Sequence, residues 1–468
     1  MVFSSIVFLW VLLPVILITY YISPIRMRNG LLTVFSLFFY AWGEPRLIVL
    51  MIVSVLINYT FGLLIERYGK KKGLLALCVA INLLLLGYFK YFNFVVDTLN
   101  ALLAPAGVSI AAGKVALPIG ISFYTFQALS YVVDVYRGEN KAQHNLVNMM
   151  LYISFFPQLI AGPIVKYHDI EEQMEHRTVT AESFSYGIKR FIFGLGKKVI
   201  LANSFAEVVD AVYAYSPSDV SQPLLWLTAV FYMMQIYFDF SGYSDMAIGL
   251  GKMFGFTFNE NFTLPYVSTS IREFWRRWHI SLSSWFREYV YIPLGGNRRG
   301  NARTYVNLWI VFLLTGIWHG AGWTFIIWGI YHGLFNVLER AFLGKWLEKK
   351  SLRPLAHVYA VFVVLIGWIF FRAETIGQAG EFIYNLFVPH EAVILPERYM
   401  NRKMWILLAA GIAGCGPLQW LLERFGKTRL AADGKIGAAA WAGYMAVLWF
   451  SILLLINNTY NPFIYFRF

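Results

Sequence analysis

Runs of about 20 apolar residues recur along this chain, and they constrain its fold more than any other feature. A helix of that length spans a bilayer core, where each backbone polar group must be hydrogen-bonded within the segment. The sequence is 58% hydrophobic and 14% charged, as is typical of membrane proteins. We predict an all-α, polytopic integral membrane protein with about 10–12 membrane-embedded helices. Finding no repeat and no soluble domain, we expect one membrane domain over residues 1–468, with a motif-rich core at about 115–345.

The formal net charge of +13 does not require a nucleic-acid partner. In a membrane protein, lysine and arginine gather in cytoplasmic loops. If Arg26, Arg28 and the lysines at 70–72 are cytoplasmic, the N-terminus lies outside. A later basic loop at 427–435 then leaves the C-terminal residues 457–468 outside as well. We identify no metal-ligand cluster and expect no metal.

The apolar runs give a predicted order of membrane segments. They cover residues 2–23, 31–42, 46–65, 73–92, 115–136, 148–165, 222–240, 305–341, 354–372, 403–421 and 438–456. We expect 148–165 to be broken, because it contains Pro157 and Pro163, and 93–114 to be a polar outer segment. Asp239 lies at the end of the run at 222–240 and Asp245 follows it. They are explained by hydrogen bonds between helices, or by Ser244 or Asp245 capping a following helix.

Residues 264–304 differ in kind, because seven arginines fall between positions 272 and 303. Apolar and aromatic residues recur there at spacings of three and four, which predicts one or two amphipathic helices in the cytoplasmic interface. His279 follows Trp275 by four positions and Arg276 by three, so a continuous helix would place it beside them.

Residues 305–341 are predicted to form a helical hairpin with a glycine-rich bend at His319. The apolar run before this histidine rises roughly 20 Å as a helix, which places His319 deep in a core about 30 Å thick. An ionisable group at that depth is a functional-site hypothesis; the alternative is a neutral histidine hydrogen-bonded between packed helices. The neighbouring Gly316, Gly320 and Gly322 allow a bend or the close approach of a ligand.

A neutral imidazole can take a proton from a hydroxyl group as that hydroxyl attacks an acyl group. His319 and His279 are therefore the candidate catalytic residues, although the sequence alone does not bring them together. His332 lies thirteen positions after His319, and we place the two near opposite ends of one helix, too far apart to act together. The arginines could hold the phosphates of a nucleotide-bearing donor or anchor the chain to anionic lipid.

Three motifs resemble the membrane-bound O-acyltransferases (MBOAT), and within them the AlgI-like group of alginate O-acetyltransferases. They are Arg-Arg-Trp-His-Ile-Ser-Leu-Ser at 276–283, Gly-Ile-Trp-His-Gly at 316–320 and Tyr-Phe-Asp-Phe-Ser-Gly-Tyr-Ser-Asp-Met-Ala-Ile-Gly at 237–249. The resemblance implies helices around a central tunnel, His319 as the family's essential histidine and His279 at a second tunnel position. It also implies that Arg272, Arg276 or Arg277 binds the phosphates of the donor.

The same resemblance implies transfer of an acetyl group from cytoplasmic acetyl-CoA across the bacterial inner membrane. The expected acceptor is an extracytoplasmic polysaccharide such as alginate, reached through an SGNH-type partner. Two alternatives stay open: D-alanyl transfer to teichoic acid from a carrier-protein thioester, and a non-enzymatic transporter or flippase. We see no inverted repeat of the kind transporters often carry.

Overall fold

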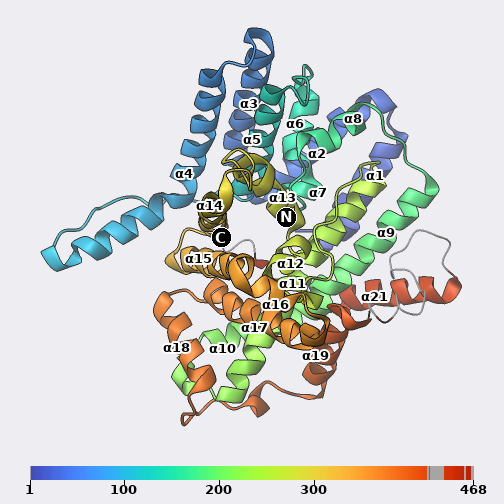
Figure 1. The fold of residues 1–468 in the computed structure, drawn as a ribbon. Coiled ribbons are helices and arrows are strands. Elements are labelled where there is room, and N and C mark those ends of the chain that lie inside the picture. The colour runs from blue at the N-terminus through green and yellow to red at the C-terminus, as the bar shows by residue number, and fades with distance from the viewer. Residues whose placement is uncertain (1, 419–420, 422–436, 458–459, 465–468) are drawn as a thin grey trace. The chain divides into compact units, whose positions relative to one another are not determined.

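The computed structural model describes residues 2–418, 421, 437–457 and 460–464. These residues form helices and their connections, with one isolated β-bridge between Val220 and Ile394. The prediction of an all-α protein is confirmed for this part of the chain. Two compact units are present, Met1–Gly187 with Leu250–Asn259 and Ile188–Gly249 with Glu260–Phe468, and we describe each by itself (Figure 1). The single-domain expectation for 1–468 stays a prediction.

The first unit is a set of helices in which α3 packs against α4 and α5, and α2 packs against α6. Its helices are α1 (Leu13–Ile22), α2 (Arg28–Gly43), α3 (Ile48–Tyr68), α4 (Lys72–Leu103), α5 (Ile121–Arg137), α6 (Leu146–Ser154), α7 (Phe156–Leu159) and α8 (Tyr167–Glu175). The buried amides of Asn58 and Asn82 donate to each other at 3.0 Å and join α3 to α4. Such polar pairs link helices where lipid offers no hydrogen-bond partner.

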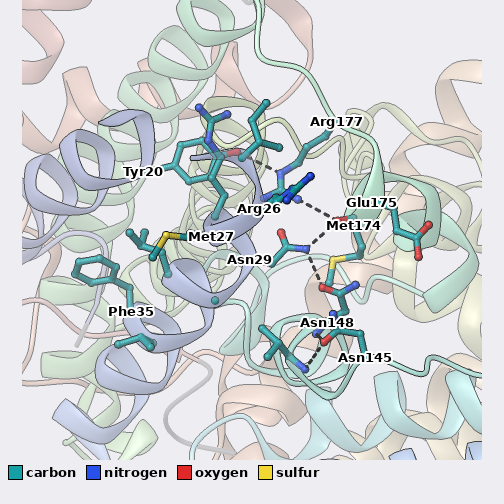
Figure 2. Close-up of a pocket in the computed structure, with 16 residues that line it drawn as sticks. Tyr20, Arg26, Met27, Asn29, Phe35, Asn145, Asn148, Met174, Glu175 and Arg177 are labelled. Carbon is teal, nitrogen blue, oxygen red and sulfur yellow. Dashed lines mark hydrogen bonds between the residues drawn. The ribbon is translucent and has the colours of Figure 1, made fainter. Parts of the chain in front are cut away.

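Asn29 ties α2 to two later elements of the same unit. Its amide nitrogen donates to Asn148 Oδ1 of α6 at 2.8 Å and to the Met174 carbonyl of α8 at 2.9 Å (Figure 2). The predicted break in 148–165 is confirmed, because α6 ends at Ser154 and Pro157 lies in the first turn of α7.

The second unit begins within α9 (Ala181–Gly196), and its framework is formed by α15, which packs against α14, α17 and α12. Its helices are α10 (Asn203–Tyr213), α11 (Gln222–Met253), α12 (Ile271–Arg277), α13 (Ile280–Phe286), α14 (Gly300–His319), α15 (Trp323–Leu338), α16 (Gly344–Leu347), α17 (Arg353–Arg372), α18 (Ile376–Phe387), α19 (Arg402–Gly414) and α21 (Ala438–Asn457). Helix α18 was not predicted; with 12 residues it is too short to register as a membrane run.

By length and composition, five helices of the described residues can cross a membrane. They are Ile48–Tyr68, Lys72–Ala106, Gln222–Met253, Lys350–Arg372 and Ala438–Asn457. The prediction of a multi-pass membrane protein is therefore supported, whereas the count of 10–12 stays a prediction. The basic loop predicted at 427–435 lies outside the described residues.

Helix α4 continues to Leu103 and so runs through the first half of the segment expected outside, 93–114; the side of the membrane on which this segment lies stays a prediction. No glycine or proline interrupts this stretch before Pro105, so the helix has no reason to stop earlier.

Asp239 and Asp245 lie inside α11, which continues to Met253, so the capping interpretation is wrong. Both carboxylates instead form ion pairs: Asp239 with Lys198 at 2.6 Å, and Asp245 with Lys197 at 2.7 Å and with Arg190. The other interpretation, hydrogen bonds between helices, is confirmed. Charges buried in a membrane protein are expected to pair with one another in this way.

Candidate active site

The hairpin of α14 and α15 positions His319 as the last residue of α14. The two helices touch through glycines: a Cβ on Gly316 would lie 2.4 Å from the Phe325 carbonyl oxygen, and one on Gly329 would lie 2.4 Å from that of Phe312. The predicted bend at His319 is confirmed. Packing explains the glycines, since the space beside Gly320 is filled by the Phe325 ring rather than left open for a ligand.

His279 lies at a break between two short helices. Helix α12 ends at Arg277, Trp278 is extended, and His279 has φ +45° and ψ +54° at the N-cap of α13. Left-handed backbone is uncommon for a residue other than glycine, and such residues cluster at functional sites. The expectation that His279 lies beside Trp275 and Arg276 on one helix face is therefore wrong, because the helix ends before it.

The structure brings the two candidate histidines together. The centroids of the His279 and His319 rings are 6.3 Å apart, and both side chains are buried. The Trp318 ring contacts both, at 6.0 Å from His279 and 5.0 Å from His319. Phe240 packs on His279 at 4.6 Å, and Trp328 packs on His319 at 4.9 Å. Aromatic rings thus enclose a pair of imidazoles.

Asn261 fixes the orientation of His279. Its Oδ1 accepts from the backbone N–H of Ser281 at 3.1 Å, which identifies this atom as the oxygen, and lies 3.2 Å from His279 Nδ1. Nδ1 must then carry the hydrogen, so the lone pair of the neutral ring is on Nε2. The Asn261 carbonyl also accepts from the N–H of Ile280 at 3.0 Å and so holds the left-handed backbone. Sequence reasoning missed this residue, which stands 18 positions before His279.

His332 is not on the helix of His319, contrary to the sequence-based placement. It lies on α15, and both histidines pack on Trp328, with ring centroids 4.9 Å from His319 and 5.0 Å from His332. The His332 ring also lies 5.2 Å from Trp275 and is fully buried. The indole of Trp328 lies in contact with both rings, so His332 belongs to the wall of the site.

Buried Glu339 positions α12. Its two carboxylate oxygens accept the N–H groups of Ile271 at 2.6 Å and Arg272 at 3.0 Å, two of the four groups that a helix N-terminus leaves unbonded. Ser270 accepts a third, from Glu273 at 3.0 Å.

The three predicted donor-binding arginines differ in their surroundings. Arg277 donates to Glu273 Oε1 at 3.0 Å and lines a cavity of about 710 Å³, whereas Arg272 and Arg276 are exposed and are not part of its lining. The lining consists of Leu264, Val267, Thr269, Glu273, Arg277, Lys350, Arg353, Pro354, His357 and Pro417. Its cationic side chains suit an anion such as a phosphate.

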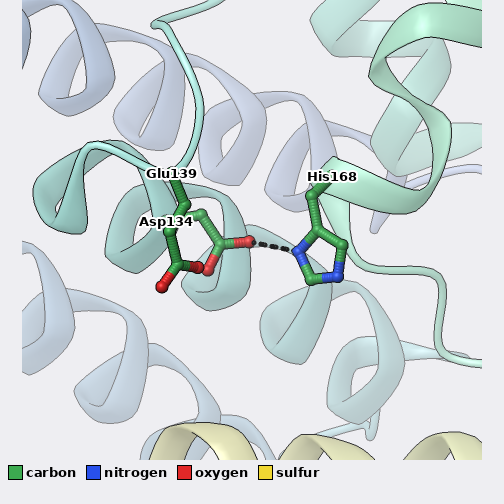
Figure 3. Close-up of side chains that lie close together, drawn as sticks. All are labelled: Asp134, Glu139 and His168. Carbon is green, nitrogen blue, oxygen red and sulfur yellow. Dashed lines mark hydrogen bonds and ion pairs between the residues drawn. The ribbon is translucent and has the colours of Figure 1, made fainter.

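A separate cluster of one histidine and two carboxylates, His168 with Asp134 and Glu139, lies in the first unit. His168 Nδ1 is 3.1 Å from Asp134 Oδ2, and Glu139 lies close by (Figure 3). The hydrogen bond to Asp134 raises the pKa of His168, as does the charge of Asp169, while burial opposes the change. The three groups are close enough to share a cation, but the nitrogen nearest to the carboxylates is already hydrogen-bonded. We therefore assign them an ion pair.

Residues 88–376 match the family described as MBOAT, membrane-bound O-acyltransferase family. The chain is 43% identical to a probable alginate O-acetylase of Pseudomonas putida, with all of both chains covered. It is 49% identical to the protein of that name in Azotobacter vinelandii, over 83% of this chain and 78% of the relative. A peptidoglycan O-acetyltransferase of Helicobacter pylori is 35% identical over 81% of this chain and 78% of its own length.

Proposed function

The chain belongs to the membrane-bound O-acyltransferase family, and we propose that it passes an acetyl group from cytoplasmic acetyl-CoA toward an extracytoplasmic polysaccharide. The membrane is the bacterial inner membrane, with both termini outside. An SGNH-type partner completes the transfer to an alginate-like polymer. The relatives named as alginate O-acetylases support the acetyl group and the polysaccharide class.

The observation that carries the proposal is the buried pair of His279 and His319. Two imidazoles within aromatic walls provide proton acceptors where water is scarce, and electrostatic effects are strong in such surroundings.

In the proposed reaction, His319 takes the proton of an acceptor hydroxyl while the hydroxyl oxygen attacks the thioester carbonyl carbon. The new C–O bond replaces the C–S bond, and coenzyme A leaves as the thiol after its sulfur receives the proton. His279, with its lone pair on Nε2, assists from the cytoplasmic side by accepting a hydrogen bond. General-base catalysis of this kind is worth about 10²–10⁴-fold in rate.

The donor's phosphates are proposed to bind at the cavity that contains Arg277. Arg277 shares its charge with Glu273, so Lys350 and Arg353, which are exposed at the same cavity, contribute most of the attraction. Arg272 and Arg276 lie on the same helix, where they provide long-range attraction for an anionic donor.

D-alanyl transfer is the rival within the family. A teichoic acid D-alanyltransferase of Bacillus subtilis is 29% identical over 54% of this chain, well below the values for the acetylases. A direct test supplies inverted membrane vesicles with labelled acetyl-CoA or with a D-alanyl carrier-protein thioester. We expect transfer of label from acetyl-CoA alone, with loss of transfer in His319→Gln. Label from the carrier thioester would establish the rival, and movement of unmodified polymer without label would indicate a transporter.

A further inference from the structure

A cavity of about 810 Å³ in the first unit has one basic side and one apolar side (Figure 2). It lies where α2 meets α6 and α8. The residues that carry the argument are the three arginines Arg26, Arg28 and Arg177, and the apolar residues Leu31, Val34 and Phe35. The acyl-transfer proposal uses none of them.

The basic side is built around the buried ring of Tyr20. The Arg28 guanidinium lies 4.8 Å from the ring centroid, and that of Arg177 lies 5.9 Å from it. Arg26, at the same cavity, is exposed. Among the described residues, none of these arginines forms an ion pair with a carboxylate; Glu175 lines the cavity without pairing. The cavity therefore holds three positive charges against one negative charge.

Arg177 is held in place by the protein itself. Its Nε donates to the Phe254 carbonyl at 3.1 Å and to the Tyr20 hydroxyl at 3.2 Å, and its Nη1 donates to the Met174 carbonyl at 3.4 Å. These acceptors are neutral, so they orient the guanidinium without neutralising it. A fixed cation at the wall of a cavity favours an anion over water because little further ordering is needed on binding.

The apolar side is a stripe along α2. Leu31, Val34 and Phe35 are spaced by three and four positions and so share one helix face. Val34 is 67% exposed, and Met27, one residue before the helix, is 62% exposed. Exposed apolar side chains on a membrane protein contact acyl chains, so this stripe continues the cavity toward lipid.

We propose that this cavity binds one anionic phospholipid. The phosphate lies among Arg26, Arg28 and Arg177, and an acyl chain lies along Met27, Leu31 and Val34. Basic pockets between membrane helices are known to take such headgroups on the cytoplasmic side, which is the side we expect for Arg26 and Arg28. The lipid would contact α2 and α8 beside the Asn29 bonds and would thereby stabilise the first unit.

The test uses the purified full-length protein in nanodiscs or detergent. Native mass spectrometry would measure retention of phosphatidylglycerol against phosphatidylcholine for the wild type, Arg26→Gln and Arg28→Gln. Arg67→Gln is the matched control, since it removes an equal charge from an exposed residue of the same unit outside the cavity. Losing one charge-assisted contact should weaken phosphatidylglycerol binding about tenfold, with no change in the control.

The competing occupant is free phosphate, and a second arm addresses it. Inorganic phosphate at millimolar concentration should neither displace phosphatidylglycerol nor raise the melting temperature in phosphatidylcholine. Displacement by phosphate, or equal loss of phosphatidylglycerol in all three variants, would overturn the lipid site. If Arg28→Gln does not fold, Arg26→Gln carries the test, because the exposed Arg26 guanidinium forms no hydrogen bond or ion pair among the described residues.

Discussion

The imidazole rings of His279 and His319 lie 6.3 Å apart between centroids, although 40 positions separate them in the chain. The His279 ring is positioned by a left-handed backbone between two short helices, α12 and α13. The His319 ring is positioned by the turn of the α14–α15 hairpin, where α14 ends. Two unrelated local structures thus deliver one group each to a buried, aromatic-walled site. The proposed chemistry depends on this convergence.

The first prediction concerns Asn261, which we propose as a positioning residue. Asn261→Ala should lower kcat about 10- to 100-fold, because it removes the acceptor for His279 Nδ1 and for the Ser281 N–H, each worth about 1–3 kcal/mol when buried. The measurement is acetyl transfer at saturating donor, with a circular dichroism check of folding. Ser281→Ala is the control: it removes one hydroxyl donor to Asn261 and should have a much smaller effect. Equal losses in both variants would refute the role.

The second prediction concerns donor binding. Lys350→Ala and Arg353→Ala should each raise the KM for acetyl-CoA several-fold and leave kcat nearly unchanged, because a phosphate contact is made equally in ground and transition states. Arg277→Ala should do the same, with an added loss of stability from its contact with Glu273. Arg272→Ala and Arg276→Ala, outside the cavity lining, serve as controls with smaller effects. An unchanged KM for acetyl-CoA in all five variants would leave anchoring to anionic lipid as the remaining role of these basic side chains.

The third prediction concerns pH and His168. Its pKa is raised above 6.5 by Asp134, so the ion pair stabilises the fold below pH 6.5, and this stabilisation is lost as pH rises through the folded-state pKa. The melting temperature of the wild type should therefore fall relative to His168→Gln across that range. The shift should be small, because about a third of the His168 side chain is exposed. His176→Gln, which changes the residue after the same helix and leaves the His168–Asp134 pair intact, should keep the pH dependence of the wild type. An identical profile in His168→Gln and His176→Gln would contradict the assignment.

The fourth prediction concerns orientation in the membrane. A membrane-impermeant thiol reagent applied from outside should label Pro105→Cys and Asn457→Cys, but not Lys70→Cys or Arg298→Cys. Each single cysteine is introduced in a background without Cys78 and Cys415, both of which are buried. Labelling of Arg298→Cys from outside would reverse the proposed direction of transfer.

The sequence predicts a structural feature when the residues that cause it are adjacent in the chain, and it misses the feature when they are distant. The hairpin at His319 follows from an apolar run and its glycines, both adjacent in the chain. The break at His279 does not, because its cause is Asn261, 18 positions earlier, and no glycine or proline marks the turn. The capping interpretation of Asp245 is wrong for the same reason: its partners, Arg190 and Lys197, come from another helix.

The His319 ring is part of the packing of the site, because it contacts Trp318, Trp328 and Phe371. His319→Ala should therefore lose both activity and stability, with a cavity cost of about 2–5 kcal/mol. Alanine alone would not separate a chemical role from a structural one.

The most direct test is the acetyl-transfer rate of His319→Gln beside His332→Gln. Glutamine retains hydrogen-bonding groups but cannot exchange a proton near neutral pH, and both histidines are buried against Trp328. With insertion and melting behaviour matched, we predict that His319→Gln loses about 10²-fold or more in rate, while His332→Gln retains most of its activity. Near-normal transfer of acetyl groups by His319→Gln would contradict the catalytic assignment.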